Sequence, residues 1–153
     1  MLVLSSFVAM RSSQTEPDRL RRFVWVNLAV FAALAVLHTW PLALALDTLS
    51  RNDTADTVLH EWTLAWLAHQ IVHDPLHLFD ANIFYPDRLT LAYSDHLFIP
   101  GIVVAPLLWA GGSPVFAYNL LLITGLASTG WVMSLVVMQW TGNRMAGLIS
   151  GSL

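Results

Sequence analysis

The sequence predicts an all-α membrane protein with three transmembrane helices, the start of a fourth, and a large external loop that carries a juxtamembrane helix. Hydrophobic residues make up 56% of the 153 residues and charged residues only 11%, whereas a soluble domain has ~25% charged residues. The mean hydropathy is +0.61. Apolar residues also gather in long runs without charge, and ~20 such residues are enough to cross a bilayer.

The first predicted span covers residues 23–46 and follows an N-terminal segment of residues 1–22. No side chain in the span is charged, and tryptophans lie near both of its ends, as is typical of membrane helices. Four arginines precede the span, namely Arg11, Arg19, Arg21 and Arg22. The positive-inside rule therefore places the N-terminus in the cytoplasm.

Residues 97–110 form the second predicted span and residues 115–140 the third. The second is short for ~30 Å of hydrocarbon and contains two prolines, so we expect it to start earlier, to be kinked or to be re-entrant. Residues 144–153 begin another apolar run, which we interpret as the start of a truncated fourth span. The sequence is thus expected to be the N-terminal fragment of a longer protein.

Residues 47–96 form the predicted external loop, which is periplasmic or extracellular in this topology. A helix is expected over about residues 56–73, because this segment has no glycine or proline and Asp74-Pro75 ends it. The remainder is rich in aromatic residues and turn formers without a clear period. We expect it to be irregular structure lying over the membrane surface.

Carboxylates in this loop are the first candidates for chemistry. Asp53 and Asp56 are three residues apart at a helix start, so they face the same way and could hold Mg²⁺ or Mn²⁺. One of them could instead act as a general base on an acceptor hydroxyl. Helix capping is the competing interpretation. Asp95, at the mouth of the second span, could face a lipid-linked substrate or be an ordinary boundary residue.

Basic and aromatic side chains of the loop are further candidates. Arg88 suits phosphate through bidentate hydrogen bonds, although a lone arginine among acids is more often simply paired with one, here Asp87 or Asp95. Trp62 and Trp66 are one helical turn apart on the same face. A zinc site is disfavoured, since Pro75 separates the spaced histidines, which are His69, His73 and His77.

Composition also excludes several classes of function. The net charge is −3 and there is no lysine, so nucleic-acid binding is not expected. The absence of cysteine removes disulfides, thiolate metal sites and a cysteine nucleophile.

The order of these elements resembles the GT-C superfamily of integral membrane glycosyltransferases. It is also similar to a group of large, mostly uncharacterised bacterial multi-span membrane proteins. The resemblance covers about Trp40 to the C-terminus, and the segments that carry it are Asp56-TVLHEWTLAW, Asp74-PLHLFDANIFYP, LAYSDH before a Pro-rich span, GSPVFAYNLL and TGNRMAGLISG.

This resemblance implies sugar transfer from a polyprenyl-phosphate-type donor at the outer face of a bacterial cytoplasmic (inner) membrane. It assigns Asp56 and Asp95 as catalytic carboxylates, and Asp53 with Asp56 as ligands of a possible Mg²⁺ or Mn²⁺. Arg88, Trp62 and Trp66 are the candidates for substrate binding. The chain departs from the family in lacking a strict Asp-x-Asp pair.

Two other classes of function stay open at this stage. A transporter component would favour ionisable residues within the spans, where only His38 qualifies. A non-catalytic scaffold for envelope assembly would use the loop to dock partners. Membrane lipid is a partner in every case, and the sequence leaves the sugar, the acceptor and the oligomeric state open.

Overall fold

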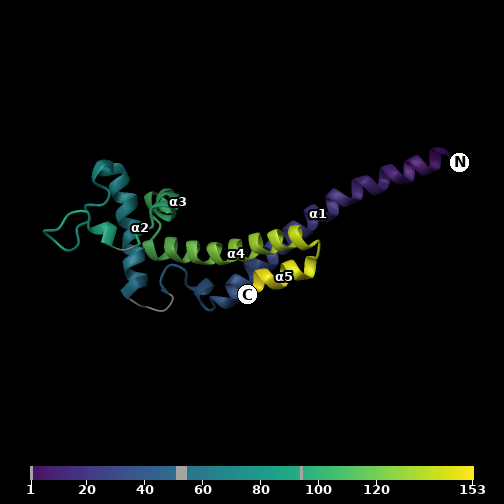
Figure 1. Ribbon diagram of the computed structural model, residues 1–153. Helices are drawn as coiled ribbons and strands as arrows, with labels where there is room; N and C mark the ends of the chain where they lie inside the picture. Colours follow the sequence, from purple (N-terminus) through teal and green to yellow (C-terminus); the bar gives the residue numbers. More distant parts are fainter. Residues whose placement is uncertain (1, 51–54, 94) are drawn as a thin grey trace. The chain divides into compact units, whose positions relative to one another are not determined.

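A computed structural model describes residues 2–50, 55–93 and 95–153, without the side chains of residues 2–17 and 19 (Figure 1). It is 75% helical, and the described residues contain no strand. The α-helices are α1 (Leu2–His38), α2 (Ala55–His73), α3 (Phe98–Trp109), α4 (Pro114–Thr141) and α5 (Arg144–Ser152). Short 3-10 helices cover Leu42–Leu44, Pro75–His77 and Thr90–Tyr93. The expectation of an all-helical chain is therefore confirmed.

Two helices are long and apolar enough to cross a membrane, judged by length and composition: Leu20–His38, within α1, and α4. They correspond to the first and third predicted spans. The other predicted spans are not confirmed. Residues 97–110 contain only the 12-residue α3, which is about 18 Å long and so shorter than ~30 Å of hydrocarbon. Residues 144–153 contain the nine-residue α5.

The first span also ends earlier than predicted. The sequence predicts a span to residue 46, but α1 ends at His38 and turns follow, including the Leu42–Leu44 3-10 helix. Pro41 explains the difference, because proline has no N–H to donate back to the carbonyl of residue 37 and its ring clashes with a helix that continues.

The chain divides into two compact units, which are described separately. The first unit comprises Met1–His38 and Thr124–Leu153, and the second comprises Thr39–Ile123. The first unit thus holds α1, α5 and the later part of α4, whereas the second holds α2, α3 and the beginning of α4.

Small and amide side chains hold the first unit together. Asn27 on α1 is buried, and its Nδ2 donates a hydrogen bond to Oγ of Ser134 on α4. At Gly130 an added Cβ would lie 2.6 Å from Phe31 Cδ1, and at Gly147 it would collide with the carbonyl oxygen of Ser134. Helices that approach so closely at glycine and share a polar hydrogen bond are typical of membrane helix pairs.

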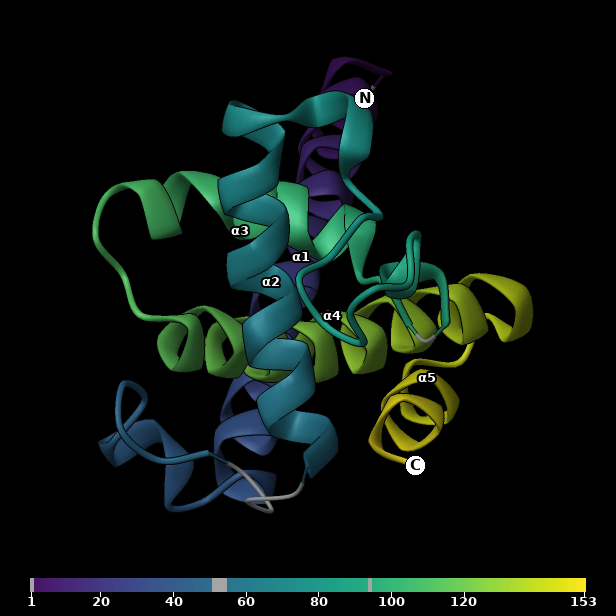
Figure 2. The same cartoon turned by 90° about the vertical axis from the view of Figure 1, so that its left-hand side faces the viewer.

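The second unit has a core where α2, α3 and the first turns of α4 meet (Figure 2). Leu64, Val104 and Ala117 contribute one buried residue from each helix. Trp109 at the end of α3 donates its Nε1–H to the carbonyl of Ala68 on α2, at 2.9 Å. These contacts fix α2, which carries three of the candidate site residues: Asp56, Trp62 and Trp66.

Gly101 marks the closest approach of α3 to α2. A Cβ at this position would lie 2.7 Å from Leu67 Cδ1 and 3.1 Å from Leu67 Cβ. Leu67 is itself buried, so Gly101→Ala is expected to lower the free energy of unfolding by about 1–3 kcal/mol through overpacking. The midpoint of thermal unfolding in detergent, followed by circular dichroism, measures this change.

Gly125→Ala is the matched control, because an added Cβ at this helical position meets no atom within 4 Å. Alanine has the higher helix propensity, so this control is expected to be neutral or slightly stabilising. Equal destabilisation by both substitutions would contradict the close packing assigned to Gly101.

Candidate functional site

A pocket of about 220 Å³ lies between α2 and the segment that connects α2 to α3. We call it the loop pocket, and it is lined by Leu59, Trp62, Thr63, Ile83, Phe84, Thr90, Leu91, Tyr93 and Asp95. Three of these residues are aromatic, two are threonines, and Asp95 is the one carboxylate. The loop pocket therefore combines flat apolar walls with a single negative charge.

The α2 wall of the loop pocket follows from helical spacing. Leu59, Trp62 and Thr63 are three or four residues apart, so they share one face of the helix. Thr63 donates its hydroxyl to the carbonyl of Leu59, at 2.8 Å, which satisfies a polar group that is almost fully buried. Trp62 stacks on Trp66 with ring centroids 5.8 Å apart.

The opposite wall is irregular backbone held by specific hydrogen bonds. Thr90 donates its hydroxyl to the carbonyl of Ala81, at 3.0 Å, and the amide of Leu91 donates to the carbonyl of Phe79, at 3.1 Å. Thr90, Ala81 and Leu91 are all buried. Short 3-10 helices at Pro75–His77 and Thr90–Tyr93 interrupt the expected irregular structure, and the segment has buried residues of its own. Its expected place over the membrane surface stays a prediction.

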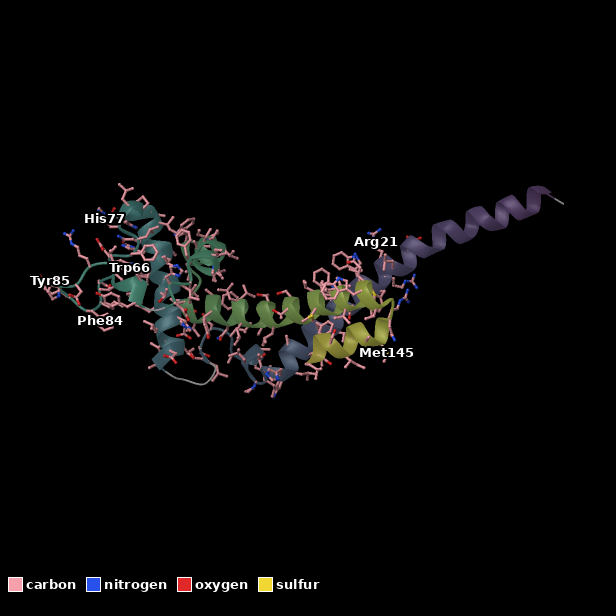
Figure 3. All side chains as sticks on the ribbon, in the orientation of Figure 1. Arg21, Trp66, His77, Phe84, Tyr85 and Met145 are labelled. Atoms are coloured by element: carbon pink, nitrogen blue, oxygen red, sulfur yellow. The ribbon has the colours of Figure 1, made fainter. Side chains whose placement is uncertain are left out.

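The tip of this segment exposes aromatic rings. Tyr85 is 94% exposed, and Figure 3 shows it at the outermost point of the segment. Phe84 is 66% exposed and lines the loop pocket. Phe84 and Leu89 have φ angles of 57° and 56°. A left-handed backbone costs a non-glycine residue about 1–2 kcal/mol. The tip is thus held in a strained conformation on the rim of the loop pocket.

Two of the predicted site residues, Asp95 and Trp62, line the loop pocket together. Asp95 is exposed and precedes α3, whereas Trp62 belongs to α2. A third, Asp56, is exposed in the first turn of α2, three residues before Leu59. It therefore lies one turn from the loop pocket on the same helical face, where it also suits the positive end of the helix dipole.

The other predicted substrate-binding residues lie outside the lining of the loop pocket. Trp66 donates its Nε1–H to the carbonyl of Leu78, at 3.0 Å, and so fastens the connecting segment to α2. Arg88 is exposed near the tip. It forms no ion pair with Asp87 or Asp95. Among the described side chains, the one contact of salt-bridge length joins the His77 imidazole and the Asp74 carboxylate, at 2.9 Å.

The predicted metal pair is only half described. Asp53 lies outside the described residues, and the side chains that the structure does describe include no group of three or more His, Asp or Glu suited to one ion. Asp56 alone does not make a metal site. The metal assignment stays a prediction.

The spaced histidines are separated as the proline predicts. His69 and His73 stack with ring centroids 3.9 Å apart on the last turns of α2. His77 lies beyond Pro75, and its Nδ1 pairs with the carboxylate of Asp74.

Sequence reasoning missed Glu61, a carboxylate that is only 8% exposed. Ser50 donates its hydroxyl to Glu61 Oε1, at 2.6 Å. Burying a carboxylate is costly unless it is hydrogen-bonded. This contact therefore stabilises Glu61 inside α2 and holds Ser50, which precedes α2 in the chain, against that helix. The signal in the sequence was a charged residue in the middle of an otherwise apolar helix.

Sequence reasoning also missed Asn119, which is fully buried on α4. Its Nδ2 donates to the carbonyls of Leu46 and Leu49, at 2.9 and 2.7 Å. Ser113 donates its hydroxyl to Asp47 and accepts the amide of Phe116, at 3.0 Å. Asp47 thus holds the start of α4, and the chain leading to α2 is fastened to that helix.

Comparison with protein-family models, with curated proteins and with solved structures finds no match to this chain. The resemblance to the GT-C superfamily therefore stays an expectation that rests on the order of the predicted elements.

Proposed function

We propose that this chain is part of a membrane glycosyltransferase that moves a sugar from a polyprenyl-phosphate-type donor to an acceptor hydroxyl. The observation that carries the proposal is the loop pocket, in which Asp95 and Trp62 from separate parts of the chain converge. An exposed carboxylate beside aromatic walls suits a ligand that has both hydroxyl groups and an apolar ring face.

Asp95 is the proposed general base. Its carboxylate takes the proton from the acceptor hydroxyl, the hydroxyl oxygen forms a bond to the anomeric carbon of the donor, and the bond from that carbon to the phosphate oxygen breaks. Polyprenyl phosphate or pyrophosphate leaves with the bonding electrons. Asp56, one turn away on α2, is the proposed second carboxylate.

The size of the loop pocket fits a small group. Its volume of about 220 Å³ is below the ~300–1,000 Å³ typical of pockets for drug-sized ligands. One sugar ring is therefore a more suitable occupant than an oligosaccharide. Arg88, exposed near the tip, is the proposed contact for the donor phosphate.

The proposed setting is the bacterial inner membrane, with the N-terminus in the cytoplasm and the loop pocket outside. Two helices of the length and composition of membrane spans support it, together with the arginines before and at the start of the first, Leu20–His38.

The intact protein, reconstituted in liposomes, tests the proposal. A panel of polyprenyl-phosphate hexoses and N-acetylhexosamines is supplied, and release of polyprenyl phosphate is measured with incorporation of sugar into lipid or water-soluble acceptors. At least one donor is expected to be consumed faster than in empty liposomes. Failure of every donor, with the protein folded and inserted, would contradict the proposed activity.

A further inference from the structure

The exposed face of α3 is apolar along its whole length. Ile99 and Val103 are 74% and 65% exposed, and Ile102, Pro106 and Trp109 are exposed on the same side. The opposite side, with Gly101, Val104 and Ala105, is buried. Among Phe98–Trp109 there is no charged side chain, and Trp109 carries the one side-chain hydrogen-bonding group.

The indole of Trp109 is arranged unusually for a residue at the water boundary. A tryptophan there normally directs its N–H to headgroups or water. The Nε1–H of Trp109 is instead donated to Ala68, although the side chain is 55% exposed. The exposed part of the ring is therefore apolar, and its only donor is already satisfied within the protein. This arrangement suits lipid hydrocarbon, which offers no hydrogen-bond acceptor.

The end of α3 lies close to the start of a candidate membrane span. Four residues separate Trp109 from Pro114, where α4 begins. Val104 of α3 and Ala117, in the first turn of α4, also belong to one buried cluster with Leu64 of α2. When α4 crosses the bilayer, α3 therefore lies at the boundary of the hydrocarbon.

A second protein chain is a poor match for this face. Protein interfaces carry about one hydrogen bond per 100–200 Å² and a polar rim, whereas α3 has no free polar side chain to contribute. Beside α3 lies a hollow of about 440 Å³, lined by Ile71, Leu78, Phe98 and Pro106 among other apolar residues. Lipid tails can fill such a hollow without any polar contact.

We propose that α3 is a membrane-boundary helix, whose Ile99–Ile102–Val103–Pro106 face contacts lipid hydrocarbon while its opposite face packs on α2. This reinterprets the second predicted span as a helix that lies against the bilayer without crossing it. The inference rests on α4 being a membrane span and is independent of glycosyl transfer.

Site-directed spin labelling tests this proposal. The 153 residues contain no cysteine, so a cysteine introduced among them is labelled without a competing site in this sequence. Val103→Cys is labelled in the intact protein in phosphatidylcholine–phosphatidylglycerol liposomes. Accessibility of the nitroxide to oxygen, which concentrates in hydrocarbon, is compared with accessibility to a water-soluble nickel complex. Val103 is expected to favour oxygen, and Tyr85→Cys, at the exposed tip, is expected to favour the nickel complex.

Two results would overturn the proposal. One is a label at Val103 that is as accessible to nickel as the label at Tyr85. The other is spin–spin broadening at Val103 that disappears on dilution with unlabelled protein, which indicates a second copy on this face. Val132→Cys, an exposed position of α4, is the reference for the span. A water-accessible Val132 would refute the membrane setting itself, whereas a lipid-exposed Val132 with a water-accessible Val103 refutes the placement of α3.

Discussion

Asp95→Asn is expected to lower the rate of sugar transfer by the intact protein by about 10²–10⁴-fold, which is the usual contribution of a positioned general base. The amide keeps the size of the side chain but takes no proton from the acceptor hydroxyl. Because Asp95 is exposed at the rim of the loop pocket, the substitution should leave folding intact. The initial rate of polyprenyl phosphate release measures the effect.

Asp87→Asn is the matched control for Asp95. It makes the same chemical change at another exposed carboxylate of the connecting segment, one that does not line the loop pocket. Its rate is expected to stay close to that of the unaltered protein. Equal losses in both variants would assign the effect to surface charge and not to proton transfer.

The second carboxylate has its own expected result. Asp56→Ala should also abolish transfer, and unchanged transfer in this variant would remove Asp56 from the proposed site.

Asn119→Asp is expected to destabilise the second unit by about 3–5 kcal/mol. The substitution removes the Nδ2 donor and places a buried carboxylate oxygen next to two backbone carbonyl oxygens, which repel it. Asn119 Nδ2 now donates to both of these carbonyls, at 2.9 and 2.7 Å. With about 4–8 °C per kcal/mol for a small domain, the midpoint of thermal unfolding should fall by 10 °C or more. Proteolysis near Leu46 and Leu49 should accelerate in parallel.

Gln139→Glu provides the comparison for Asn119. It exchanges an amide for a carboxylate on the same helix, but at an exposed position. A midpoint that falls equally in both variants would show that the charge on α4, and not the lost pair of hydrogen bonds, determines stability.

The helices themselves were largely predictable from the sequence. The charge-free, apolar run over residues 115–140 predicts most of α4. The absence of glycine and proline from residues 56–73 predicts α2. The bounds of α3 also agree with the predicted residues 97–110 to one residue at each end, but the prediction that this stretch crosses the membrane is not confirmed. The left-handed Leu97, with a φ of 45°, and the turn at Gly111 limit the helix to 12 residues.

The candidate site was predictable only in part. Spacing on one helix links Asp56 to Leu59 and Trp62, but nothing local links either to Asp95. That proximity depends on hydrogen bonds within the connecting segment, such as the one from the Thr90 hydroxyl to the Ala81 carbonyl. Local patterns likewise give no sign that Asn119 fastens the chain ahead of α2, since its acceptors are main-chain carbonyls rather than recognisable side chains.

The left-handed backbone at Phe84 and Leu89 has a consequence for recognition. A flexible loop loses conformational entropy when a ligand orders it, and that loss weakens binding. At the tip, the hydrogen bond from Leu89 N–H to Asp80 Oδ1, at 2.9 Å, restrains the backbone before any ligand binds. We therefore expect a molecule that meets Phe84 and Tyr85 to cause a smaller loss of loop entropy, so that shape complementarity contributes more to discrimination there.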